Sequence, residues 1–169
     1  MALKRLYIAI TLVSILLLLA SCGSNGCYEN RSSIPMAKFY AYNYPTKTVS
    51  IDSISIYGIG QRNDSLLLDC ARRVSSLQLP LRNDADTTQY VIRYETKSIP
   101  SSSLYNDTLT WIYTRYPYFI SGDCGVVFNY AIDTVLYTRN MLDSVAVMVD
   151  EVTNQDQETI RLYYYVATD

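Results

Sequence analysis

The chain contains no histidine. This absence excludes Ser-His-Asp and Cys-His catalytic arrangements and every metal site that depends on an imidazole ligand. The sequence also has no excess of positive charge, because 14 Lys and Arg residues stand against 16 Asp and Glu residues, for a net charge of −2. That balance excludes a protein that binds nucleic acid by neutralising phosphates, so we expect no nucleic-acid partner.

The sequence also lacks motifs for cofactors and metals. It contains neither a phosphate-binding loop nor the glycine fingerprint of a dinucleotide-binding fold. Asp84 and Asp86 lie close together but lack the ligand loop and distal glutamate of a calcium site, so they indicate an acidic turn. We therefore predict no cofactor, no metal and no enzymatic activity. A hydrolase that uses two carboxylates is kept as an alternative, although no pair of acids stands out.

Only the N-terminus carries a long apolar run. Residues 6–20 are rich in Ile and Leu, and Lys4 and Arg5 precede them. The run is too short for a membrane span, which needs ~20 apolar residues, and it predicts an export signal over residues 1–21. Its end resembles the lipobox of bacterial lipoproteins, and the matching residues are Leu19, Ala20, Ser21 and Cys22. An ordinary secretory signal that ends in Ser-Cys is the alternative.

The lipobox resemblance implies cleavage before Cys22 and acylation of its thiol, which would anchor the mature chain to a lipid bilayer. Residues 22–33 would then form the lipidated N-terminus and a short tether, and residues 34–169 a single β-domain. Gly23 stands where an aspartate retains lipoproteins in the inner membrane in the usual enteric scheme. The resemblance therefore favours the outer membrane, with the domain facing the periplasm. Exposure on the cell surface is the runner-up.

Three further cysteines follow Cys22, at Cys27, Cys70 and Cys124. The periplasm is oxidising, and three thiols allow one disulfide and one leftover. Alternation along residues 65–70 predicts that Cys70 shares a strand face with two leucines and is buried as a small apolar side chain. We therefore expect a Cys27–Cys124 disulfide and a free Cys70, with the other pairings kept as alternatives. The bond would hold the domain close to the membrane, because four residues separate Cys22 from Cys27.

The body of the chain favours strands over helices. Short alternating runs recur, and turn residues such as Asn, Asp, Gly and Pro lie between them. The runs cover residues 38–44, 50–57, 66–70, 74–81, 89–95, 109–113, 118–120, 126–137, 144–149 and 159–166. Eight to ten short strands predict an all-β fold, an antiparallel β-sandwich of immunoglobulin-like type, with a small barrel as the alternative.

Tyrosine is unusually frequent, with 17 residues in the chain. Alternation places Tyr40, Tyr42 and Tyr44 on one strand face, and Tyr163 and Tyr165 flank another tyrosine in the last strand. One interpretation is an aromatic face that binds a glycan or a small ligand. We favour the other, a core and rim built with tyrosine, because tyrosine suits strands and glycan platforms usually rely on tryptophan, of which there is one.

A tripeptide of Asp, then Ser or Thr, then an aliphatic residue or Thr occurs six times. We expect these side chains to bond the local backbone at turns that lead into strands. The tripeptide also resembles the O-glycosylation acceptor of exported proteins in some anaerobic Gram-negative bacteria. The candidate acceptor residues are Ser53, Ser65, Thr87, Thr108, Thr134 and Ser144.

Three segments together resemble an uncharacterised family of small Gram-negative envelope lipoproteins. They are residues 27–31, residues 57–60 with 63–66, and residues 123–125. The resemblance covers essentially the whole mature chain. It implies an envelope location and a single β-domain, it transfers no catalytic residues, and it fits the Cys27–Cys124 pairing, with Cys70 as a departure from the family pattern.

These observations predict a membrane-anchored lipoprotein with a non-enzymatic structural or accessory role in an envelope complex. Its partners would be the bilayer, through acylated Cys22, and an unidentified envelope protein. Ligand binding on the tyrosine face and a carboxylate hydrolase are the alternatives.

Overall fold

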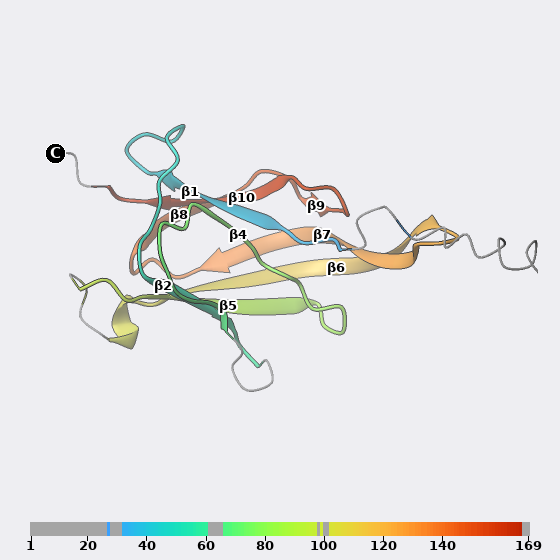
Figure 1. The fold of residues 1–169 in the computed structure, drawn as a ribbon, viewed down its shortest axis with the longest axis horizontal. Helices are drawn as coiled ribbons and strands as arrows, with labels where there is room; N and C mark the ends of the chain where they lie inside the picture. Colours follow the sequence, from blue (N-terminus) through green and yellow to red (C-terminus); the bar gives the residue numbers. More distant parts are fainter. Residues whose placement is uncertain (1–26, 28–31, 61–65, 98, 100–101, 167–169) are drawn as a thin grey trace, which may run out of the picture.

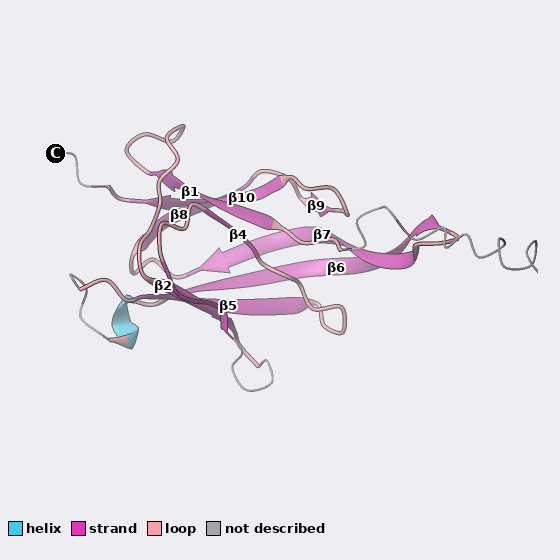
Figure 2. Cartoon of the chain, viewed as in Figure 1, coloured by secondary structure: helices cyan, strands magenta, loops and turns pink. Residues whose placement is uncertain are grey.

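A computed structural model describes residue 27 and residues 32–60, 66–97, 99 and 102–166. These residues form a sandwich of two β-sheets (Figures 1 and 2), so the prediction of an all-β sandwich is confirmed. A single 3-10 turn, η2 (Ser103–Tyr105), is the helical element of the described chain. Within the same residues no helix is long and apolar enough to cross a membrane.

The smaller sheet has four strands and contains the first and last strands of the chain. Its order is β4 (Ser76–Gln78), β1 (Met36–Ala41), β10 (Glu158–Tyr164) and β8 (Leu142–Val147). The central pair, β1 and β10, runs parallel, and the other neighbours are antiparallel. This parallel pair departs from the prediction, which was of antiparallel strands only.

The larger sheet has six strands and is antiparallel throughout. Its order is β3 (Leu66–Ala71), β2 (Ile54–Gly58), β5 (Thr87–Tyr94), β6 (Asp107–Ser121), β7 (Gly125–Tyr137) and β9 (Glu151–Val152). The separate strand predicted at residues 118–120 is instead the end of β6, which runs through Pro117. Proline is tolerated there because β6 has a neighbour on one side only at that point, so a missing N–H breaks no ladder on the other side.

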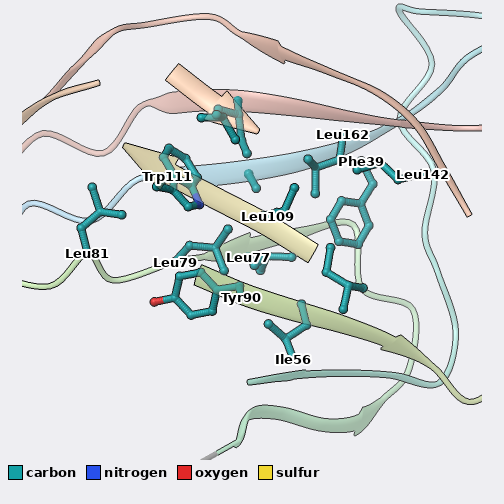
Figure 3. Close-up of a cluster of buried hydrophobic side chains, with 14 of the residues drawn as sticks. Phe39, Ile56, Leu77, Leu79, Leu81, Tyr90, Leu109, Trp111, Leu142 and Leu162 are labelled. Carbon is teal, nitrogen blue, oxygen red and sulfur yellow. The ribbon is translucent and has the colours of Figure 1, made fainter. Parts of the chain in front are cut away.

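Large apolar side chains from both sheets fill the space between them (Figure 3). Alternating strand positions supply them, because successive side chains point to opposite faces of a sheet. The labelled members are Phe39, Ile56, Leu77, Leu79, Leu81, Tyr90, Leu109, Trp111, Leu142 and Leu162. Burial of each such side chain stabilises the fold by about 1.5–3 kcal/mol relative to exposure.

One carboxylate, that of Asp107 at the start of β6, is fully buried. It accepts hydrogen bonds from three successive backbone N–H groups, at 2.7–3.0 Å, where the chain passes from β7 in one sheet to β8 in the other. The Thr138 hydroxyl and the Tyr94 hydroxyl each donate to it at 3.0 Å. The Tyr94 and Tyr164 hydroxyl groups are also hydrogen-bonded to each other, with their oxygens 3.2 Å apart, which extends the network to β10. The backbone donors belong to Asn140, Met141 and Leu142.

Replacing Asp107 with asparagine should lower the free energy of unfolding by about 2–4 kcal/mol. The asparagine NH₂ group cannot accept the hydrogen bonds that one carboxylate oxygen accepts, so buried N–H donors would lose their partner. Urea unfolding followed by circular dichroism measures the change. Asp133→Asn is the matched control, because Asp133 occupies the same place in another of the six tripeptides and is exposed. Equal stability of the two variants would contradict a special role for Asp107.

Stability should also fall in alkaline solution because of buried tyrosines. Burial raises the pKa of Tyr90 to about 12, and it raises the pKa values of Tyr94 and Tyr164 above their usual 10.0. The unfolded chain releases these protons near pH 10, whereas the folded chain retains them, so their contribution is intact below pH 10 and is lost as the pH rises toward the folded values. Urea midpoints and tyrosinate absorbance from neutral to about pH 11 test this. Full ionisation of all tyrosines in a still folded chain would contradict it.

Candidate functional site

The hairpin of β6 and β7 extends beyond the rest of the sandwich (Figure 1). The last pair between β5 and β6 joins Thr87 to Ile112, and the pair between β7 and β9 nearest the turn joins Tyr130 to Val152. Residues 116–129 therefore form a two-stranded arm, with no third strand beside it in the described structure. We call these residues the arm. An isolated two-stranded hairpin is marginally stable in water, so the arm needs additional support.

A disulfide provides part of that support. Cys27 is bonded to Cys124, 97 residues away in sequence, with Cα atoms 4.8 Å apart. Cys124 lies in the turn that joins β6 to β7 and is buried, and its backbone N–H donates to the Ser121 hydroxyl at 3.2 Å. Nearer the sandwich, the Ser33 hydroxyl donates to Asn129 Oδ1 at 2.7 Å. The N-terminal segment is thus bonded to the arm at two positions, by the disulfide at the turn and by the Ser33–Asn129 hydrogen bond nearer the sandwich.

The third cysteine, Cys70, is a free thiol but is exposed, so the prediction that it is buried is wrong. The β2–β3 pairing contains register shifts, and Cys70 has a positive φ of 41°, which breaks the simple alternation along this edge strand. Its backbone N–H donates to the Ser55 hydroxyl at 2.8 Å. A hydrogen bond to the Glu95 carboxylate is the main cause that raises the pKa of the Cys70 thiol above its usual value.

Next to Glu95 lies a cleft of about 580 Å³ that β2, β5 and the chain around η2 line. Glu95 is the single carboxylate among its described lining residues, and Arg93 holds it in an ion pair at 3.1 Å. The Ser55 hydroxyl donates to the same carboxylate at 3.2 Å. The cleft thus offers an engaged acid rather than the facing pair that the hydrolase alternative requires.

The structure brings four of the five predicted ligand-face tyrosines together across β1 and β10. Tyr40 is paired with Tyr163 in the strand register, with ring centroids 5.9 Å apart, and the Tyr42 and Tyr165 rings are 4.9 Å apart. Tyr40 is buried, whereas Tyr42, Tyr44 and Tyr165 are exposed. The alternation predicted Tyr42 and Tyr44 on a strand face. Strand β1 instead ends at Ala41, so both residues lie in the segment that follows it.

The buried end of this face serves the fold. Glu158 accepts hydrogen bonds from the Tyr40 hydroxyl at 3.0 Å and from Arg161, and it forms an ion pair with Lys38 at 3.2 Å. The Arg161 guanidinium lies over the Tyr40 ring, 4.6 Å from its centroid. Burial would raise the pKa of Glu158, but hydrogen bonds from Arg161, Lys38 and Tyr40 outweigh it and lower the pKa. The part of the tyrosine face that could contact a ligand is therefore Tyr42, Tyr44 and Tyr165.

Two of the tripeptide aspartates accept hydrogen bonds from backbone N–H groups that are distant in sequence. For these two, the expectation that the aspartate bonds the local backbone of a turn is wrong. Asp52 accepts a hydrogen bond from the Arg73 backbone N–H, 21 residues away, and Asp107 accepts hydrogen bonds from the turn before β8 and from its first residue. Of the candidate acceptor hydroxyls, Thr87 and Thr134 are exposed, and both are paired with Ile112 on the larger sheet. Ser53, Thr108 and Ser144 are half-buried. Ser65 and the predicted lipidation site, Cys22, lie outside the described residues.

Two features of this site could not be found from sequence patterns. The alternation in residues 126–137 predicts a strand. It does not predict that the neighbouring strands β5 and β9 end before they reach the arm. Asp107 resembles the other five tripeptide aspartates in sequence, and only its burial distinguishes it.

The fold and the disulfide define a small β-sandwich protein stabilised by a long-range cross-link. Residues 53–164, more than half of the chain, match a family of unknown function, DUF6452, and the chain belongs to this family. The matched region contains every strand from β2 to β10 and includes Cys124, whereas β1 and Cys27 precede it. No curated protein and no solved structure matches the chain.

Replacing Cys27 and Cys124 together with serine should lower the free energy of unfolding by about 2–5 kcal/mol, because the bond closes a long loop of the unfolded chain. Amide hydrogen exchange over residues 116–129 should become faster, since the arm loses its fastening. Cys70→Ser is the control and should change neither measurement. Unchanged stability and unchanged arm exchange in the double variant would show that the disulfide does not support the arm.

Proposed function

We propose that the chain is a lipid-anchored protein of the bacterial outer membrane with a non-enzymatic, structural or accessory role in an envelope complex. The observation that carries the proposal is the order of features at the N-terminus. An apolar run leads into Leu19, Ala20, Ser21 and Cys22, and a cysteine five positions later is cross-linked to the folded domain. An acyl chain contributes about 0.8 kcal/mol per buried methylene, and two or more chains anchor a domain firmly.

Several features of the domain support an accessory role. The sequence has no histidine, and the carboxylates that line two of the clefts in the described structure are engaged by other side chains. Glu95 is paired with Arg93, and Glu151 accepts a hydrogen bond from the Tyr116 hydroxyl. The domain therefore offers surfaces for contact rather than an assembled set of catalytic groups. Gly23 after Cys22 favours the outer membrane, with the domain on the periplasmic side.

Binding of a glycan or small ligand is a second candidate, favoured by the exposed ring pair of Tyr42 and Tyr165 with Tyr44 nearby in sequence. The loop after β1 and the end of β10 lie at the end of the sandwich opposite the arm (Figure 1). On a domain anchored through Cys22, this end would be free to meet a soluble ligand. Loss of glycan binding in Tyr165→Ala, with Tyr105→Ala unchanged, would support this second function.

Lipidation is tested in cells fed a clickable palmitate analogue. The wild-type chain should carry the label and fractionate with the outer membrane, whereas Cys22→Ala should carry none, because the acceptor thiol is gone. Cys27→Ala is the matched control and should keep the label. Intact mass of the purified wild-type protein gives the mature N-terminus. An N-terminus other than Cys22, or label that survives in Cys22→Ala, would contradict the proposal.

The accessory role is tested by co-purification. The lipidated protein is tagged after Asp169, crosslinked mildly in whole cells, extracted with detergent and analysed by mass spectrometry. A stoichiometric envelope protein that is retained by the wild-type chain supports the accessory role. Recovery of the protein alone would contradict it and favour the ligand-binding alternative. Mass additions on Thr87 or Thr134 in the same sample would identify O-glycosylation at the two candidate sites that are exposed among the described residues.

A further inference from the structure

We propose that the tip of the arm is a membrane-contact surface that sets how the anchored domain stands on the bilayer. The proposal rests on the lipidation of Cys22 proposed above and adds a second point of contact to it. Its occupant is the interfacial region of the lipid bilayer that holds the acyl chains.

The arm presents an apolar face to solvent. Phe119 is paired with Val126 and Pro117 with Phe128, and side chains of directly paired residues lie on the same side of a hairpin. These four residues therefore share one face. Phe119 is 63% exposed and Val126 is 57% exposed, and Pro117 and Phe128 are also exposed. A cluster of this kind on a soluble domain marks an interaction site.

The charge of the arm fits a lipid interface. Residues 116–129 contain no Lys or Arg and one acidic residue, Asp123. Tyr118, on the opposite face of the arm, is also exposed. Aromatic side chains are enriched where membranes meet water, because a tyrosine ring can enter the apolar boundary while its hydroxyl stays hydrated. The arm thus combines an apolar face near its tip with an exposed tyrosine on its other face.

The disulfide determines which end of the domain meets the membrane. Cys22 and Cys27 are separated by five Cα–Cα steps, which span at most about 18 Å when fully extended. Cys27 is bonded to Cys124 in the turn of the arm, two positions from Val126. The anchor therefore cannot move far from the tip. Strand β6 has 15 residues and extends about 50 Å at ~3.3 Å per residue, so the end near Asp107 lies beyond the reach of the tether.

A depth measurement on the lipidated mature protein, which begins at Cys22, tests the proposal. The protein is reconstituted into zwitterionic phosphatidylcholine vesicles, with or without lipids that carry a spin label near the headgroup. Phe119→Trp places a fluorophore on the apolar face, and Val126→Trp is a second probe of the same face. Leu104→Trp is the matched control, because Leu104 is 78% exposed in η2, at the opposite end of the sandwich (Figure 1). Trp111, the single native tryptophan, is buried and gives a constant background.

Spin-labelled lipid should lower the emission of the tryptophan at position 119 about twofold and leave that at position 104 unchanged. Equal quenching at the two positions, or none at position 119, would overturn the proposal. A second copy of the chain that covers the tip would leave position 119 unquenched and is among the overturning outcomes.

The intact mass of the same sample separates this proposal from the proposed function. An acylated protein that sediments with vesicles but is not quenched at position 119 would overturn the membrane-contact surface and leave the lipid anchor standing. A protein without an acyl chain would overturn both.

Discussion

The carboxylate of Asp107 fixes the point at which the chain crosses from one sheet to the other. A buried charge costs several kcal/mol to desolvate unless donors surround it, and here three backbone N–H groups and two hydroxyls do so. Those donors come from β5, from the segment between β7 and β8 and from the first residue of β8, and Tyr94 continues the network to Tyr164 in β10. These hydrogen bonds hold the crossover between β7 and β8 against the start of β6 and so connect the two sheets at this end.

Local pattern predicted the strands well and their partners poorly. Period-2 alternation identifies β5, β7 and β10 because each has one face in the core. It fails at Cys70, because register shifts and a positive φ break the period in an edge strand. It also carries no information about which strands pair, so the parallel neighbours β1 and β10 could not be predicted. Asp107 was missed because burial, which is a property of the fold, separates it from five similar aspartates.

The sequence identified the residues of the candidate site, the cysteine pair and the tyrosines, better than it identified their exposure and their positions in the fold. The Cys27–Cys124 pair was expected partly because Cys70 was thought to be buried, and the structure contains the pair although Cys70 is exposed. The tyrosine face was expected on a strand, whereas its exposed members lie beyond the ends of β1 and β10. The exposed face of the arm depends on where β5 and β9 stop, which no local pattern encodes. The disulfide end and the tyrosine end lie at opposite ends of the sandwich (Figure 1).

The parallel pairing of β1 with β10 has a consequence for the order of folding. Met36 is paired with Glu158, so the first strand waits for a partner that follows more than a hundred residues later. At a synthesis rate of about 5–20 residues per second, this delay is on the order of ten seconds. During that time β1 has an unpaired edge, which is open to pairing with other chains. Completion of the smaller sheet is therefore a late event that requires the whole chain, and the nascent protein has to be kept from association until its last strand is available.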